Sequence, residues 1–116
     1  MDGTIIKHNG YLSDGFDTLL EGAYEFLESI PEADMIVLIT SREEEYREST
    51  ERFLTEKGVR YDHIIFNAPY GERILINDRK PSGLITAIAV NTERNQFSLG
   101  GLKDDKDGYV LKREEA

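Results

Sequence analysis

The sequence has no cysteine, no tryptophan and only three prolines among its 116 residues. The lack of cysteine excludes a disulfide, a thiolate zinc site and a thiol nucleophile. No basic cluster stands out along the chain either. The 14 Lys and Arg residues against 23 Asp and Glu give a formal net charge of −9. A surface this negative repels phosphate backbones and anionic lipid, so we expect no nucleic-acid and no membrane partner.

Long hydrophobic runs are absent as well. No stretch approaches the ~20 apolar residues of a membrane span, and the first thirty residues contain no apolar run like that of a signal peptide. The default expectation is therefore a cytoplasmic protein. A chain of this length is expected to form about one domain, with one active or binding site.

The apolar residues that are present follow helical and strand patterns in alternation. Residues 16–30 place apolar side chains at helical spacing, and residues 43–57 form a second, more charged helical face that stops at Gly58. Four short apolar runs predict strands, at residues 34–40, 63–66, 73–77 and 86–91. Residues 35–39 of the first run are continuously apolar, which predicts a strand buried on both faces.

The order of these elements predicts an α/β fold. Strands that alternate with helices are typical of a three-layer, Rossmann-like parallel sheet flanked by helices. Residues 1–91 are expected to form this domain. Residues 92–116 are polar and are expected to form a C-terminal extension, with a loop and a small hairpin around "GYVL".

Polar residues at strand ends are the candidate site residues, because ligands of open parallel sheets bind beyond the carboxyl ends of the strands. The candidates are Asp2, Thr4, Thr40, Ser41, Arg42, Asn67, Asn77, Asp78 and Asn91. All of them except Asn67 and Asn91 fall in three segments, "MDGT", "MIVLITSR" and "ILINDRKPSG", in that order along the chain.

These three segments resemble the motifs of the haloacid dehalogenase (HAD) superfamily of phosphohydrolases. The resemblance covers about residues 1–91 and is greatest to small phosphatases without a cap domain that are associated with polysaccharide biosynthesis. It implies a Mg²⁺-dependent hydrolase, a phosphomonoesterase that acts on a small phosphorylated metabolite such as a sugar phosphate.

The resemblance implies a catalytic role for Asp2. In the family, a first aspartate attacks phosphorus and a second, two residues later, acts as general acid and base. "MDGT" resembles the last four positions of that motif, so Asp2 resembles the second aspartate and also a metal ligand. The first aspartate, the nucleophile of an aspartyl-phosphate mechanism, would lie one residue before Met1.

The family places a central strand of its sheet before this motif. A chain without that strand would leave two neighbouring strands with unpaired backbone groups. We therefore expect poor folding of the 116-residue chain, replacement of the strand by another segment, or a longer natural protein.

The other two motifs imply a phosphate site and a metal site. The strand end at residues 40–42 resembles the phosphate-binding motif, which makes Thr40, Ser41 and Arg42 phosphate ligands together with Thr4. Asn77 and Asp78 resemble the acidic pair that holds Mg²⁺, with Asn77 in a place where the family often has a second aspartate.

One family residue is missing from the sequence. "FNAPYGE" has Ala68 where small members of the family commonly have a phosphate-neutralising lysine before proline, and Arg42, Arg73 and Lys80 are the candidate substitutes. Residues 5–16 are long enough for a flap over the site, from which Lys7, His8 and Tyr11 would contact the substrate. An open site would suit a large substrate or one shielded by a second subunit, which leaves a homo-oligomer open.

Simpler structural interpretations stand beside these functional ones. Asp2 and Thr4 could belong to a mobile terminus, Thr40 could cap the following helix, and Asp78 could begin a turn. Three hypotheses for the whole protein follow: the phosphomonoesterase, a catalytically inactive HAD-like domain that binds a phosphorylated ligand or protein partner, and an acidic interaction domain without a phosphate site.

Overall fold

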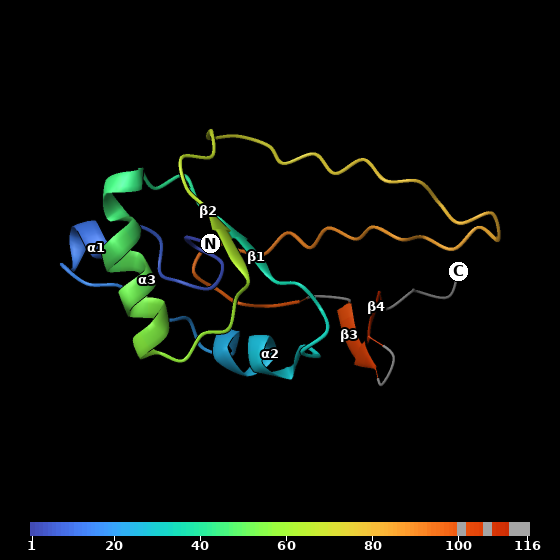
Figure 1. Cartoon of the computed structure of the whole chain (residues 1–116), viewed down its shortest axis with the longest axis horizontal. Helices are drawn as coiled ribbons and strands as arrows, with labels where there is room; N and C mark the ends of the chain where they lie inside the picture. The colour runs from blue at the N-terminus through green and yellow to red at the C-terminus, as the bar shows by residue number, and fades with distance from the viewer. Residues whose placement is uncertain (100–101, 106–107, 112–116) are drawn as a thin grey trace.

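A computed structural model of the chain describes residues 1–99, 102–105 and 108–111, with side chains described for residues 1–99. Its elements, in chain order, are α1 (Gly10–Ser13), α2 (Ala23–Ser29), β1 (Val37–Ile39), the 3₁₀ turn η1 (Glu44–Tyr46), α3 (Arg47–Glu56), β2 (His63–Ile65), β3 (Leu102–Asp105) and β4 (Gly108–Leu111). Figure 1 shows the helices and the β1–β2 pair at one end of the molecule, with a long loop projecting from them.

The sheet that organises the domain has two parallel strands. β1 pairs with β2 with Leu38 opposite Ile64, and α3 lies between the two strands in the chain. This is the strand–helix–strand unit that the sequence predicts. The described residues thus form a small mixed helix and strand domain, and the larger three-layer sheet stays a prediction.

One face of this sheet is covered and the other is open. Leu38 is buried, whereas Val37 and Ile39 are about two-fifths exposed. The prediction of a strand buried on both faces is therefore wrong in this structure, because the helices cover one side of the strand pair. The core on the covered side consists of Ile5, Ile6, Ala23, Leu27, Ile36, Leu38, Leu54 and Val59.

The second predicted helix is confirmed and the first is confirmed only in part. η1 and α3 fill residues 44–56, and Gly58, just beyond, adopts a positive φ of 68°. The helix predicted over residues 16–30 is limited to α2, because Gly22 has a φ of 86° and the preceding stretch bonds elsewhere. Leu20 N–H donates to the carbonyl of Ile5 at 2.8 Å. Residues 16–22 therefore pair with the N-terminal loop instead of forming helical turns.

The loop between β2 and the tail contains the other two predicted strands. We call residues 72–91 the arm; its two extended runs lie beside each other and project from the domain (Figure 1). The structure assigns no strand to 73–77 or 86–91, and Ile74, Leu75 and Ile76 are 70–90% exposed. A strand forms only where backbone groups pair in a ladder, and no ladder is described between these two runs or between either of them and β1 or β2.

The tail returns to the domain before it forms the predicted hairpin. Asn95 N–H donates to the carbonyl of Gly3 at 2.7 Å, and the rings of Phe97 and Phe26 pack with centroids 5.4 Å apart. β3 and β4 pair in antiparallel fashion, which confirms the hairpin. The rest of the extension, residues 100–101, 106–107 and 112–116, lies outside the described residues.

Within the described part of the chain, every helix is too short or too polar to cross a lipid bilayer.

Candidate functional site

The N-terminal "DGT" segment is a tight loop beside the end of β1. Gly3 has a φ of 81°, and its N–H donates to the carbonyl of Ile6 at 2.6 Å. Only a residue without a Cβ adopts this conformation at little cost. The loop turns the Asp2 carboxylate toward Thr40, whose hydroxyl donates to Asp2 Oδ2 at 2.7 Å.

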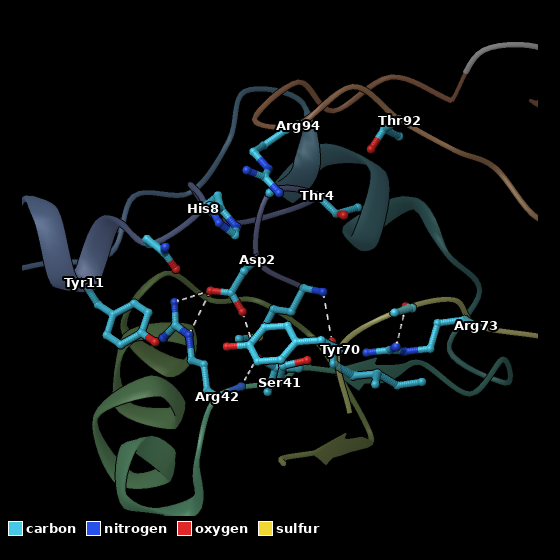
Figure 2. Close-up of a pocket in the computed structure, with 16 residues that line it drawn as sticks. Asp2, Thr4, His8, Tyr11, Ser41, Arg42, Tyr70, Arg73, Thr92 and Arg94 are labelled. Carbon is cyan, nitrogen blue, oxygen red and sulfur yellow. Dashed lines mark hydrogen bonds and ion pairs between the residues drawn. The ribbon is translucent and has the colours of Figure 1, made fainter. Parts of the chain in front are cut away.

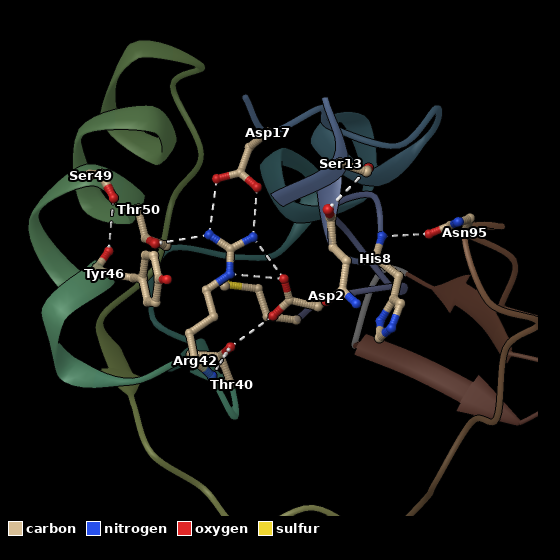
Figure 3. A network of polar contacts seen from close by, with 12 residues as sticks. Asp2, His8, Ser13, Asp17, Thr40, Arg42, Tyr46, Ser49, Thr50 and Asn95 are labelled. Atoms are coloured by element: carbon tan, nitrogen blue, oxygen red, sulfur yellow. Dashed lines mark hydrogen bonds and ion pairs between the residues drawn. The ribbon is translucent and has the colours of Figure 1, made fainter. Parts of the chain in front are cut away.

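Arg42 lies at the centre of a buried polar network (Figure 3). Its Nε and Nη2 lie 2.9 and 2.7 Å from Asp2 Oδ1. Its Nη1 and Nη2 also donate to the carboxylate of Asp17 at 2.9 and 2.6 Å. Nη1 donates in addition to the hydroxyl of Thr50 at 2.9 Å. All three guanidinium nitrogens are therefore already bound by groups of the protein.

The surroundings of Arg42 keep it charged and in place. Its side chain is only 2% exposed. Burial lowers the pKa of its guanidinium, but the hydrogen bonds that it donates to Asp17 and Asp2, with the negative charge of these carboxylates, outweigh burial and leave that pKa raised. The ring of Tyr11 lies 4.0 Å from the guanidinium carbon, and burial raises the pKa of the Tyr11 hydroxyl. Arg42 thus stabilises the site instead of presenting a free positive charge to a ligand.

A cavity of about 440 Å³ opens beside Asp2 (Figure 2). It lies where β1 ends and the N-terminal loop, the start of the arm and residues 92–94 meet. The functional groups at its wall are Asp2, Thr4, His8, Tyr11, Thr40, Ser41, Arg42, Tyr70, Arg73, Thr92 and Arg94, together with the Met1 amine.

The cavity is more basic than the chain as a whole. Asp2 is the single acidic side chain among its described lining residues, and it is paired with Arg42. Arg73 and Arg94 line the cavity and form no ion pair with a carboxylate in the described part of the chain. In a protein with a formal net charge of −9, this local excess of cations favours an anionic ligand.

Backbone contacts bring Arg94 to the cavity. The Asn95 side chain accepts a hydrogen bond from the His8 N–H at 2.6 Å, and the Asn95 N–H donates to the Gly3 carbonyl. A Cβ added to Gly3 would lie 3.3 Å from Arg94 Cγ, so the loop and the arginine stem are in close contact. Across the cavity, Arg73 Nη1 donates to the carbonyl of Gly71 at 2.9 Å. Figure 2 shows Arg94 above Asp2 and Arg73 to the right of it.

The structure brings together the predicted phosphate ligands but not the predicted metal ligands. The five residues that line the cavity as predicted are Asp2, Thr4, Thr40, Ser41 and Arg42. Asn77 and Asp78 lie in the arm and do not line it. There the Asn77 amide donates to the Thr86 hydroxyl at 2.8 Å, and that hydroxyl donates to the Asp78 carbonyl at 2.6 Å.

Among the described residues, no group of three or more carboxylate or imidazole side chains is arranged so that it could hold a metal ion. Both oxygens of Asp2 already accept hydrogen bonds, Oδ1 from Arg42 and Oδ2 from Thr40. The described arrangement therefore does not offer the set of oxygen ligands that Mg²⁺ prefers.

The remaining candidate residues also fall into those that line the cavity and those that do not. His8 and Tyr11 line the cavity, whereas Lys7 is paired with Asp14 at 2.7 Å and does not. Lys80, a candidate substitute for the missing lysine, also lies away from the cavity. The interpretation of Thr40 as a helix cap is not supported, because Glu43 and Tyr46 hold the cap positions of η1 and α3. The Thr40 hydroxyl instead accepts the N–H of Arg42 at 3.1 Å.

Sequence reasoning missed four residues of the site, Tyr70, Thr92, Arg94 and Asp17. Thr92 and Arg94 fall in the polar extension, where no local pattern sets them apart. Asp17 lies in the stretch predicted as helix. Its pairing with Arg42 spans 25 residues, and a contact of that range leaves no mark in local periodicity.

Comparison of the chain with protein-family models, with curated proteins and with solved structures found no match.

Proposed function

We propose that the protein is a HAD-like phosphomonoesterase whose cavity binds the phosphate group of a small metabolite such as a sugar phosphate. The observation that carries the proposal is the basic cavity at the carboxyl end of β1, with Asp2 at its wall. This is the position where parallel sheets bind ligands.

Phosphate suits the groups that surround the cavity. Arg73 and Arg94 both line the cavity, on different parts of its wall, and arginine presents a planar fork of donors that matches phosphate oxygens. The hydroxyls of Thr4 and Ser41 lie at the same wall and supply neutral donors. The charge of the phosphate is thus met by side chains with no carboxylate partner in the described residues, while Arg42 holds the site together.

Asp2 is the candidate general acid and base of the reaction. In hydrolysis of a phosphomonoester, the bond between phosphorus and the ester oxygen breaks. Water supplies a hydroxyl to phosphorus and a proton to the departing alcohol. A carboxylate beside the bound phosphate is placed to deliver that proton and to accept one from water. The covalent route through an aspartyl-phosphate needs, in addition, a carboxylate one residue before Met1.

Mg²⁺ belongs to the proposal only as the cofactor that the HAD resemblance implies. Asn77 and Asp78 lie outside the cavity in the described arrangement, and both oxygens of Asp2 are already bound. We therefore assign no step to the metal.

A second candidate function is binding of a phosphorylated ligand without turnover. Two observations favour it. Both carboxylate oxygens of Asp2 already accept hydrogen bonds, and the predicted metal ligands Asn77 and Asp78 lie outside the cavity. It needs the cavity cations but no free catalytic carboxylate.

One pair of variants separates catalysis from structural support. Asp2→Asn and Asp17→Asn each remove one negative charge from Arg42, but Asp2 lines the cavity and Asp17 does not. We would measure release of inorganic phosphate from a panel of sugar phosphates in Mg²⁺, and binding of inorganic phosphate by calorimetry. Circular dichroism would show that both variants are folded.

The phosphomonoesterase predicts turnover that Asp2→Asn abolishes and Asp17→Asn largely retains. Phosphate binding without turnover, weakened by Arg94→Ala, would favour the second candidate. Neither turnover nor phosphate binding would contradict both and favour the acidic interaction domain.

A further inference from the structure

Another pocket, of about 310 Å³, lies where α1 and the segment after it meet η1 and α3 (Figure 1). Four of its nine lining residues are aromatic, whereas aromatic residues make up 9% of the whole chain; they are Tyr11, Phe16, Tyr46 and Phe53. Among the described lining residues, this pocket shares Tyr11 alone with the cavity beside Asp2. A small hollow with such a concentration of rings suits a small ligand.

The rings of this pocket offer surfaces that attract a cation. Those of Tyr11 and Tyr46 pack edge to face, with centroids 5.0 Å apart and planes at 71°. Rings at such an angle form adjoining walls, and the face of an aromatic ring carries partial negative charge. The guanidinium carbon of Arg42 already lies 4.0 Å from the centroid of Tyr11. Lys57 Nζ lies 6.0 Å from the centroid of Phe53, so contacts between cations and rings are present around the pocket.

The charges at this pocket favour a positive ligand over a negative one. Glu56 lines it and pairs with no basic side chain in the described part of the chain. Arg52 also lines it, but its Nη2 is paired with Glu48 at 3.0 Å. Over residues 43–57, six glutamates stand against three basic residues. The potential around the pocket is therefore negative, which attracts a cation.

We propose that this pocket binds a small organic cation with a quaternary ammonium group, such as a trimethylammonium compound. Phe16, Tyr46 and Phe53 would contact the methyl groups and attract the charge, and the carboxylate of Glu56 would complement it. The Phe16 side chain is 63% exposed, so a bound cation also removes apolar surface from water. The site is separate from the cavity beside Asp2 and does not depend on phosphate chemistry.

Other cations suit this pocket less well. A metal ion needs several oxygen ligands, and Glu56 is the single carboxylate without an ion pair among the described lining residues. A primary ammonium carries three N–H donors, which would lose their water and find few acceptors among four aromatic rings. A quaternary ammonium has no N–H to satisfy, and its methyl groups pack against rings. A pocket lined in this way therefore selects a methylated cation.

The test compares two probes of nearly the same shape. They are choline and its uncharged isostere, in which a carbon atom replaces the quaternary nitrogen. Binding of each probe to the full chain is measured at fixed ionic strength from the NMR chemical shifts of the Tyr46 and Phe53 amides. We expect choline to bind about tenfold more tightly, because the rings attract its charge and give the neutral probe only apolar contact. Equal affinities, or no binding of choline, would overturn the proposal.

Two aromatic variants locate the binding site. Phe16→Leu removes a ring of the pocket but keeps an apolar side chain, and its exposure means that the protein should still fold. We expect it to lower the affinity for choline about fivefold and to change the affinity for the neutral probe less than about twofold. Tyr24→Leu removes a ring on α2 that does not line the pocket, and it should change neither affinity. Equal losses of choline affinity in the two variants would contradict binding at this pocket.

A second pair of variants tests the role of charge. Glu56→Gln should weaken choline binding about threefold, because it removes the unpaired carboxylate of the pocket. Glu25→Gln makes the same change to net charge on α2, outside the pocket lining, and should leave the affinity nearly unchanged. Equal effects would show a response to net charge and overturn the role of Glu56.

A short peptide that carries trimethyllysine is the third probe, because it presents the same group on a protein chain. We expect it to bind no more tightly than choline, since a pocket of this volume encloses the ammonium group and little else. Tighter binding of the peptide would overturn the assignment of a free small molecule as the ligand.

Discussion

Arg42 and Asp17 form a two-pronged ion pair in the interior, with Nη1 2.9 Å from Oδ2 and Nη2 2.6 Å from Oδ1. The two side chains are 2% and 7% exposed. Asp17 precedes β1 and Arg42 follows it, and the same guanidinium also holds Asp2. The network therefore ties the N-terminal loop to the end of β1 and shapes the cavity wall.

Replacing Arg42 should be costly because it leaves two partly or fully buried carboxylates without their counter-charge. We expect Arg42→Met to lower the free energy of unfolding by about 3 kcal/mol or more, measured by urea denaturation. The control is Arg52→Met, which breaks the exposed pair with Glu48 and should cost less than about 1 kcal/mol. Similar losses in the two variants would contradict the structural role of Arg42.

The two arginines without a carboxylate partner should carry phosphate binding. We expect Arg73→Ala and Arg94→Ala each to weaken the affinity for inorganic phosphate about tenfold, because each removes a charge-assisted hydrogen bond. Calorimetry at fixed ionic strength measures this. Arg79→Ala removes a cation from the arm at a position that does not line the cavity, and it should leave the affinity nearly unchanged. Equal losses of phosphate affinity in all three variants would indicate that phosphate responds to the net charge of the protein and not to a specific site.

Gly3 and Gly15 form a matched pair for the contact with Arg94. Both have a φ of 81°, but a Cβ on Gly15 meets nothing within 4 Å, whereas one on Gly3 meets Arg94 Cγ at 3.3 Å. Gly15→Ala should cost about 1 kcal/mol of unfolding free energy through backbone strain alone. Gly3→Ala should cost more and should also weaken phosphate binding, since Arg94 must move. Equal unfolding free energies and equal phosphate affinities in the two variants would show that the contact between Gly3 and Arg94 contributes to neither.

In the 116-residue chain, the Met1 amine should make the free energy of unfolding depend on pH. Burial lowers its pKa below 8.0, as do Arg73 and Arg42, while Asp2 acts in the opposite direction. Between the lowered pKa and 8.0 the unfolded chain binds more protons than the folded one, so the free energy of unfolding rises with pH across that window.

Urea denaturation from pH 6 to 9 tests this expectation. The comparison is the same chain acetylated at its N-terminus, which has no amine to titrate. The difference in stability between the two chains should change with pH only below about 8. A difference that stays constant throughout would show that the amine is not buried in the folded protein.

The sequence pattern correctly predicted those helices and strands that are determined by residues close to one another in the chain. The charged helix at residues 43–57 ends at a glycine with positive φ, and the short apolar runs at 34–40 and 63–66 contain β1 and β2. Strand order then placed Asp2 and the residues after β1 at one edge. Residues 16–22 were mispredicted because their apolar spacing suits a helix equally well, and hydrogen bonds with Ile5 and Lys7 decided otherwise.

The sequence by itself determined the composition of this protein's site: an aspartate in a glycine loop, hydroxyls at a strand end, and an acidic chain with few cations. Only the tertiary structure decided which cationic side chains are available to an anionic ligand. Arg42 is paired with Asp2 and Asp17. Arg94 comes from the C-terminal extension and reaches the cavity because the next residue, Asn95, is hydrogen-bonded to Gly3 and His8. The physical reason is range: periodicity records neighbours within a few residues, whereas these pairings span tens of residues and arise only when the chain has folded.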